Sequence, residues 1–343
     1  MSQLGRKLLN RIKTHLVASL IILLFASCTN KSERSILNIK DASFDRGQIS
    51  SGNNDPNSII YEDNVDVLLV SLYYGKSIEE IKKTLGWEDS KMQETIDLLI
   101  ENGMLTENNG IYTPTVFVLP LKVGIALKKE SNLIANEISD SIVSGLDKFK
   151  ELHDKTDISK QYSFKDLSFF YLSDIVLDMG QISNVESLFL KKERPLRNGK
   201  NYYFSIMEKD TTKKEAAFGI YGNQGLLNND SIYIGVYGNT RYQEAGWDDY
   251  KNKEVHYFSK NDYSILFKEF NKLFLPTLIN ILEKNDAEFL KLFNEYGYSG
   301  KISFEEFFIW YYHLIYTEAT NELIKKEVIK KPESGLLYYQ IEL

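Results

Sequence analysis

Hydrophobic and polar residues follow two different periods along this chain, and together they predict an α+β protein. Apolar residues three or four positions apart, which predict buried helix faces, recur in residues 121–180 and again in 261–330. Residues 200–258 instead contain runs rich in Tyr, Phe, Ile and Val, separated by polar or glycine-containing turns, as is typical of strands. We therefore expect a helical and antiparallel-sheet domain over residues 121–343.

Capping residues predict where several of these helices begin and end. Ser163, with Asp166 three residues later, is expected to begin a helix that ends at Gly180. Pro276 is expected at the start of another helix, because proline is favoured in the first turn. The closing run GLLYYQIEL, residues 335–343, is expected to add an edge strand.

Residues 62–120 carry a separate pattern of three apolar segments followed by two short strands. The second segment begins at Ser77, where Glu80 completes a capping box, and ends at Gly86. The sequence Asn-Asn-Gly at 108–110 supplies a tight turn between the strands. This order of segments resembles a winged helix-turn-helix domain, in which the two strands form the wing. The resemblance implies a winged-helix-like module before the α+β domain.

The charge of this module argues against nucleic acid as its partner. Residues 77–115 contain eight acidic and three basic residues, a net charge of −5, and the whole chain has a net charge of −7. DNA-binding surfaces instead use Arg and Lys to neutralise phosphates and to contact bases. We therefore expect a packing or protein-contact module, because fold does not fix function. A membrane-tethered regulator facing the cytoplasm is an alternative.

The first residues have the features of a bacterial export signal. Four basic residues precede an uncharged, almost wholly apolar run from Leu16 to Phe25. They are Arg6, Lys7, Arg11 and Lys13. The run has about half of the roughly 20 apolar residues that a membrane-spanning helix needs, so we do not expect it to anchor the protein.

The next residues, Phe25, Ala26, Ser27 and Cys28, resemble the lipobox of bacterial lipoproteins. The resemblance implies cleavage of residues 1–27 as a signal peptide and attachment of a diacylglycerol to the Cys28 thiol. Cys28 is the only cysteine in the chain, so an internal disulfide is impossible. We expect a protein of the cell envelope that is anchored by lipid to a bacterial membrane, with the outer membrane as the expected one. The polar residues 28–61 are expected to form a flexible tether.

Glu306 and His313 are the best candidates for an acid–base pair. They are seven residues apart in an aromatic stretch that is predicted to be helical, which places them on roughly the same face. A histidine in such a stretch is also commonly a core residue with one hydrogen bond. A hydrolase that uses this pair is therefore an alternative hypothesis, and a buried His313 would exclude it.

Glu306 also lies in the segment 295–307, which resembles the second half of an EF-hand calcium loop, with Gly300 at the sharp turn. Gly297, however, supplies no side-chain oxygen where that family has Asp or Asn. The other explanation is that Ser303 and Glu306 form a capping box for the following helix. We expect the cap, and we expect neither a metal ion nor a cofactor.

Two further loops contain candidate ligand-binding residues. Trp247 precedes Asp248 and Asp249, and an aromatic ring beside paired carboxylates can hold a sugar or a cation, although an exposed hairpin loop has the same composition. Asn223 and Asn239 end two similar pentads, GIYGN and GVYGN, whose glycines supply either a turn or a ligand loop. These residues also offer a second site for the hydrolase hypothesis, at Asp248 and Asp249.

These features predict a lipid-anchored envelope protein with a non-enzymatic role. No serine-hydrolase elbow, phosphate-binding loop or dinucleotide-binding fingerprint is present in the sequence. The expected partners are the membrane, through the lipid, and a protein or a glycan. The hydrolase and the tethered regulator are the two alternatives.

Overall fold

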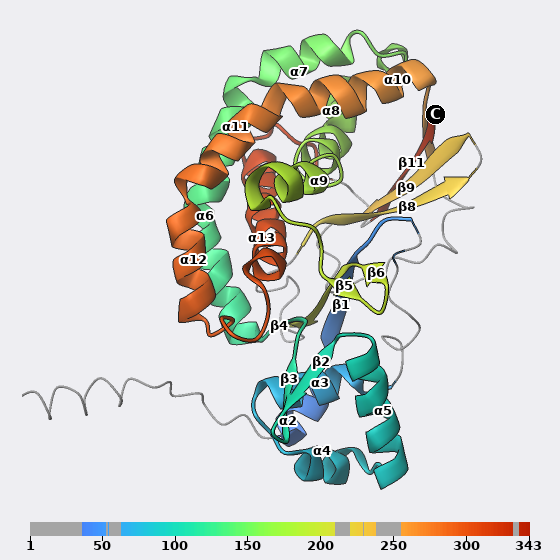
Figure 1. The fold of residues 1–343 in the computed structure, drawn as a ribbon. Helices are drawn as coiled ribbons and strands as arrows, with labels where there is room; N and C mark the ends of the chain where they lie inside the picture. The colour runs from blue at the N-terminus through green and yellow to red at the C-terminus, as the bar shows by residue number, and fades with distance from the viewer. Residues whose placement is uncertain are drawn as a thin grey trace, which may run out of the picture.

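The structure is a computed structural model that describes residues 36–52, 54, 63–209, 220–228, 230–237, 255–331 and 336–343. These residues form an α+β protein with one continuous hydrophobic core (Figure 1). The predicted signal peptide, residues 1–27, and the predicted lipidation site Cys28 lie outside the described residues. None of the described helices is both long and apolar enough to cross a membrane.

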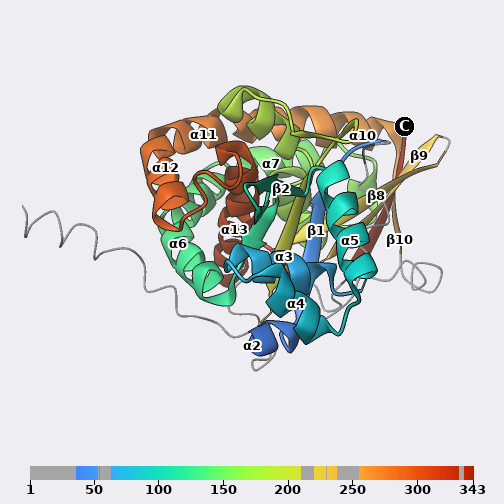
Figure 2. The ribbon, with the colours of Figure 1, turned by 60° about the horizontal axis from the view of Figure 1, so that its bottom comes forward.

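A long central helix organises the larger, upper part of the molecule. This helix, α13 (Phe304–Lys325), is apolar on nearly every side, and a helix of that kind is stable only when other elements surround it. Other helices curve around it, as the two views show (Figures 1 and 2). They are α6 (Leu121–Ser144), α7 (Leu146–His153), α10 (Lys260–Ser264), α11 (Asn271–Lys284) and α12 (Asp286–Glu295).

The remaining helical segments are short and contain three π-helical turns. They are η2 (Ile158–Lys160), α8 (Phe164–Ser168), η3 (Phe169–Ile175), α9 (Ile182–Asn184), η4 (Val185–Leu190) and η7 (Ile265–Phe270). The predicted capping box of Ser163 and Asp166 is present at the start of α8. Pro276 does not begin a helix as predicted, because η7 already leads into α11, and the proline lies inside α11.

Two mixed sheets replace the single antiparallel sheet that the sequence predicted. One has the strand order β1-β7-β4 and the other the order β10-β11-β9-β8. The pairs β4–β7 and β10–β11 are parallel, and the other pairs within these sheets are antiparallel. The strands are β1 (Phe44–Ile49), β4 (Phe117–Leu119), β7 (Tyr203–Glu208), β8 (Gly222–Asn228), β9 (Ser231–Tyr237), β10 (Val255–Phe258) and β11 (Leu336–Glu342).

The prediction of an antiparallel sheet is wrong because strands from distant parts of the chain enter both sheets. The closing run of the sequence forms β11, which lies between β9 and β10 and is not the predicted edge strand. Its alternating residues Tyr339 and Ile341 are completely or almost completely buried, as an interior strand requires. No local pattern shows that this run would be inserted between two earlier strands.

The lower part of the molecule contains three helices and a hairpin in the predicted order. They are α3 (Val65–Tyr73), α4 (Ile78–Leu85), α5 (Asp89–Glu101), β2 (Leu105–Asn108) and β3 (Ile111–Pro114). The capping box of Ser77 and Glu80 is present, and Gly86 ends α4 with a φ of 70°. Asn109 and Gly110 both have positive φ, as the tight turn of a two-residue hairpin requires. We refer to these elements as the three-helix module.

Residues 36–49 are folded although they belong to the segment predicted as a tether. They form α2 (Ile36–Lys40), which packs against α3 and α4, and strand β1, which pairs antiparallel with β7. Gly47 in β1 lies so close to Ser205 and Trp310 that a Cβ there would be 2.6 Å from the serine oxygen. The prediction of a continuous tether over residues 28–61 is therefore wrong for this part, because β7 needs an antiparallel neighbour along one edge.

Gly180 has a different role from the predicted helix terminus. It follows the π-turn η3, and a Cβ at this position would overlap the carbonyl oxygen of Ile175 and the side-chain amide of Asn271. We expect Gly180→Ala to lower the free energy of unfolding by at least about 2 kcal/mol, because a backbone atom cannot move aside cheaply.

Urea denaturation followed by circular dichroism measures this loss. Gly225→Ala is the matched control, because a Cβ at Gly225 meets no atom within 4 Å. Equal unfolding midpoints for the two variants would contradict the close packing at Gly180.

Candidate functional site

Glu306 forms a buried ion pair with Arg197, and this pair is structural. The amide of Glu306 donates to the Ser303 hydroxyl at 3.1 Å, so one half of the predicted capping box of α13 is present. The Glu306 carboxylate, however, does not accept a hydrogen bond from the Ser303 amide. It accepts one from Arg197 Nη2 at 2.6 Å and one from the Phe204 amide at 3.4 Å. Burial raises the pKa of Glu306, and the Arg197 guanidinium opposes that shift. Glu306 is thus occupied within the protein and is not available to calcium or to a substrate.

Arg197 reaches Glu306 because a tight hairpin directs it into the core. Strands β5 (Leu196–Arg197) and β6 (Lys200–Asn201) are joined by Asn198 and Gly199, which both have positive φ. The guanidinium also donates to three backbone carbonyl oxygens, those of Gly103, Thr115 and Tyr202. One side chain therefore connects the end of α5, the segment before β4 and the segment before β7 to α13.

The structure does not bring Glu306 and His313 together. Seven residues of helix correspond to a rise of about 10 Å, and each side chain has its own partners. His313 is only 6% exposed, and its Nδ1 lies 2.7 Å from the carbonyl oxygen of Ile309. The hypothesis of an acid–base pair of Glu306 and His313 is therefore not supported, because both groups are sealed from solvent and lie in separate environments.

His313 instead lies beside two buried aspartates that sequence reasoning did not identify. Asp174, in the π-turn η3, and Asp178 are 1% and 5% exposed. Asp178 Oδ1 is 3.9 Å from His313 Nε2, and its Oδ2 accepts a hydrogen bond of 2.8 Å from the amide of Asn223 on β8. Both carboxyl oxygens of Asp174 lack a hydrogen-bond partner among the described residues. The candidate ligand residue Asn223 therefore serves an internal contact.

The protonation states in this cluster are set by burial. Burial raises the pKa of Asp178 to about 7 and, together with the nearby Asp178, raises that of Asp174 well above its ordinary value. Burial also lowers the pKa of His313 to about 4. His313 is thus neutral at neutral pH, with its Nδ1 proton directed at Ile309, and the contact of 3.9 Å with Asp178 is not a salt bridge. Among the described residues, no lysine or arginine forms an ion pair with either aspartate.

The sequence contained one signal for this cluster. Asp174 and Asp178 are four residues apart in the otherwise apolar run FFYLSDIVLDMG, so one helical face carries both carboxyl groups into the core. Asp174 lies in the π-turn η3, and π-turns are often found at functional sites.

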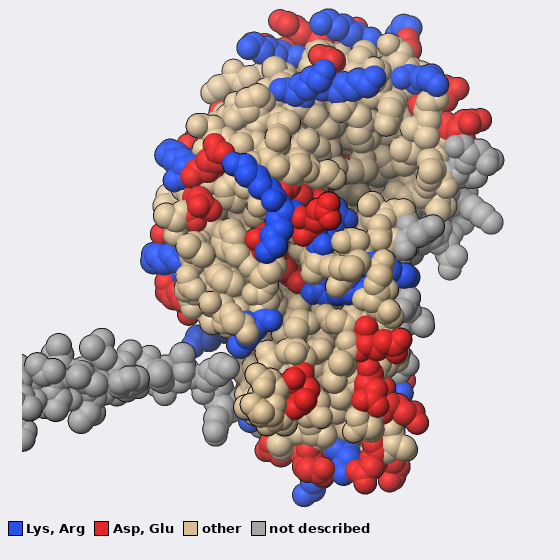
Figure 3. All heavy atoms as spheres, in the orientation of Figure 1, with Lys and Arg blue, Asp and Glu red and all other residues tan. Residues whose placement is uncertain are grey.

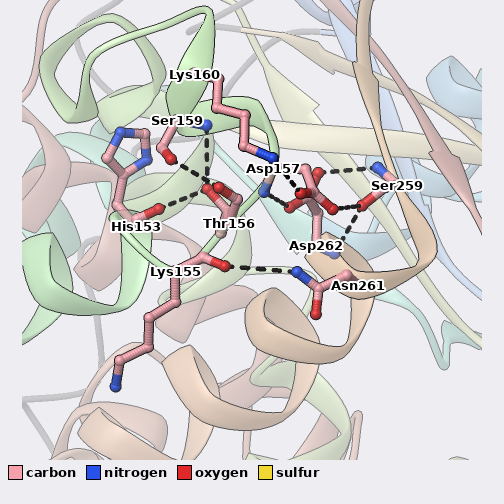
Figure 4. A network of polar contacts seen from close by, with 9 residues as sticks. All are labelled: His153, Lys155, Thr156, Asp157, Ser159, Lys160, Ser259, Asn261 and Asp262. Atoms are coloured by element: carbon pink, nitrogen blue, oxygen red, sulfur yellow. Dashed lines mark hydrogen bonds and ion pairs between the residues drawn. The ribbon is translucent and has the colours of Figure 1, made fainter.

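A second network of polar groups, most of them at least partly exposed, joins the loop after α7 to the start of α10 (Figure 4). The Asp157 amide donates to Asp262 at 2.6 Å, and the Ser259 hydroxyl donates to the Asp157 carboxylate at 2.8 Å. Lys160 pairs with the other oxygen of Asp157 at 2.9 Å. These contacts form helix caps and turns, so we assign this network a structural role.

The surface of the three-helix module carries a groove with a volume of about 680 Å³. The end of α3, the first turns of α4, the middle of α5 and the turn between β2 and β3 line it. The eight acidic residues counted in the sequence of this module are all exposed, and Figure 3 shows acidic side chains gathered over α5. This groove is one open site on the described part of the chain.

Several predicted site residues lie outside the described part of the chain. They are Cys28, Asn239, Trp247, Asp248 and Asp249. Within the described part, no group of three or more His, Cys, Asp or Glu residues is placed to hold a metal ion.

No protein-family model, curated protein or solved structure matches this chain.

The Arg197–Glu306 pair predicts a large loss of stability when one partner is removed. We expect Glu306→Gln to lower the free energy of unfolding by about 3–5 kcal/mol, because the Arg197 charge would remain buried without its counterion. Glu288→Gln, in the exposed pair with Lys291, is the matched control and should have almost no effect. Equal unfolding midpoints in urea would show that the buried pair does not stabilise the fold.

The aspartate cluster and His313 predict opposite dependences of stability on pH. The folded Asp178 carboxyl keeps its proton up to about pH 7, whereas an unfolded aspartate releases it near 3.8, so Asp178 lowers stability as pH rises through this interval. Burial lowers the pKa of His313 from 6.5 to about 4, so His313 lowers stability as pH falls through that interval.

Measured against wild type, Asp174→Asn/Asp178→Asn should therefore gain stability as pH rises from 4 toward 7. His313→Gln should gain stability as pH falls from 6.5 toward 4. Each group changes the free energy of unfolding by up to about 1.4 kcal/mol per pH unit. Subtracting the wild-type value from that of the variant at each pH cancels the titration of all other groups. Chemical denaturation at several pH values measures these differences, and slopes of the same sign for both variants would refute these protonation states.

Proposed function

We propose that this chain is a lipid-anchored protein of the bacterial cell envelope that acts by binding another protein. The observation that carries this proposal is the contrast between its two candidate sites. Glu306 and His313 are buried and occupied by internal contacts, whereas the groove of the three-helix module is open and surrounded by exposed charge. A role in binding needs such a surface, and it does not need a reactive group.

We further propose that the three-helix module is a winged-helix-like domain used for protein contact. The order α3, α4, α5, β2 and β3 and the tight turn at Asn109–Gly110 support this assignment. The exposed acidic residues favour a protein partner over DNA, because a surface with a net charge of −5 repels phosphates. The same surface gives no support to a membrane-tethered DNA-binding regulator.

The lipid anchor rests on the sequence of residues 25–28 and on the short apolar run before them. The site for the lipid is the Cys28 thiol, and the membrane proposed for it is the outer membrane. The loop with Asp248 and Asp249 stays a prediction, both as a catalytic site and as a glycan site.

Metabolic labelling with an alkyne analogue of palmitate tests the anchor. Wild-type protein is expected to carry the label and to sediment with membranes, while Cys28→Ala should carry no label and should keep its leader. Ser32→Ala is the control variant, since it changes a nearby residue and leaves the proposed lipobox intact. Membrane association with an intact leader and an unmodified Cys28 in the wild-type protein would refute the proposal.

A further inference from the structure

The groove of the three-helix module has an apolar floor that is suited to side chains of a peptide. Leu72, Met92 and Ile96 line it, and each is at most 5% exposed, so they form a fixed apolar base. Its volume of about 680 Å³ lies within the range of roughly 300–1,000 Å³ that is usual for ligand pockets. The floor can therefore receive apolar side chains.

One wall of the groove is formed by an apolar residue that is strongly exposed. Ile111, the first residue of β3, is 68% exposed at the hairpin turn and lines the groove together with Gly110 and Tyr112. Partner binding would remove this apolar surface from water, which favours association. A partner bound in the groove would thus cover the exposed side chain of Ile111.

The charges on the surface around the groove, and not those of its lining, select the sign of its occupant. The lining contains Lys76 and Lys82 as well as Glu79 and Asp89, which both pair with Lys82, so its own charges cancel. Five further exposed acidic residues lie on α5, at its start and along the hairpin. They are Glu88, Glu94, Asp97, Glu101 and Glu107. A basic partner is attracted to this surface, and acidic partners are repelled.

We propose that this groove binds a basic, amphipathic segment of a partner protein, with its apolar side chains on the floor and its lysines or arginines against the acidic surface. This inference rests on the proposed binding function and names the site and the class of partner.

Charge and composition disfavour the other possible occupants. A second copy of this chain would bring the same acidic surface, and like charges would face each other. Residues 29–35, which precede α2, contain no large apolar side chain that could cover the floor. A basic segment of another protein meets both requirements.

Binding of selected peptides to the full mature chain tests the inference. A phage-displayed library of random peptides is selected on the immobilised chain, and the enriched peptides are measured by fluorescence anisotropy. We expect enrichment of peptides that combine Lys or Arg with Leu, Ile or Phe. Counterparts in which Lys and Arg are replaced by Glu should not bind detectably.

Matched variants locate the site. Ile111→Ser should raise the Kd of the selected peptides by about tenfold or more, as expected for loss of an apolar anchor. Leu133→Ser, at a position 82% exposed on α6 and outside the groove, should leave the Kd unchanged. Glu88→Lys/Glu94→Lys should raise the Kd of basic peptides, because it removes part of the electrostatic attraction. For the same reason, the Kd measured with this variant should depend less on salt concentration than that of wild type.

Three results would overturn the inference. They are the absence of peptide binding, equal affinity for the acidic counterparts, and an unchanged Kd for Ile111→Ser. Self-association that Ile111→Ser abolishes, measured by sedimentation velocity, would also overturn it by identifying a second copy as the occupant. Because these measurements do not involve the lipid, their failure would leave the result of the palmitate labelling intact.

Discussion

The contact between the Arg197 guanidinium and the Glu306 carboxylate joins the two parts of this protein inside their shared core. Both groups are almost completely buried, and the guanidinium also donates to carbonyl groups at the end of α5 and before β4 and β7. Each charged group would be costly in the core without the other. The three-helix module therefore meets α13 through these polar contacts and through the shared apolar core, in which the ring centroids of Tyr73 and Tyr298 are 6.4 Å apart.

The interior above this contact is unusual in combining many aromatic rings with a few unpaired polar groups. The rings of Phe170 and Tyr339, for example, stack at 3.9 Å between η3 and β11. Next to such rings, Asp174 has no described hydrogen-bond partner, and the fold tolerates it by keeping its carboxyl group protonated. A cluster of this kind lowers stability at neutral pH, so its presence in the core requires either a compensating contact or a role that selection maintains.

Local features of the fold could be predicted from the sequence, whereas contacts between distant segments could not. The cap at Ser77 and the turn at Asn109–Gly110 depend on neighbouring residues only, and both are present. The insertion of β11 between β9 and β10 and the pairing of β1 with β7 depend on the whole core. The site followed the same division: Ser303 caps α13 as expected, but the Glu306 carboxylate turns to Arg197, a residue 109 positions away in the sequence. Long-range partners of this kind leave no local pattern.

The early start of the folded chain limits how far the protein can reach from a membrane. Helix α2 begins at Ile36, so a lipid on Cys28 would be separated from the folded part by the seven residues 29–35. Fully extended, these residues span at most about 25 Å. The three-helix module would then sample only a thin layer of water next to the bilayer. Molecules in the same membrane would meet it at a high local concentration, and those farther away would have to come to the surface.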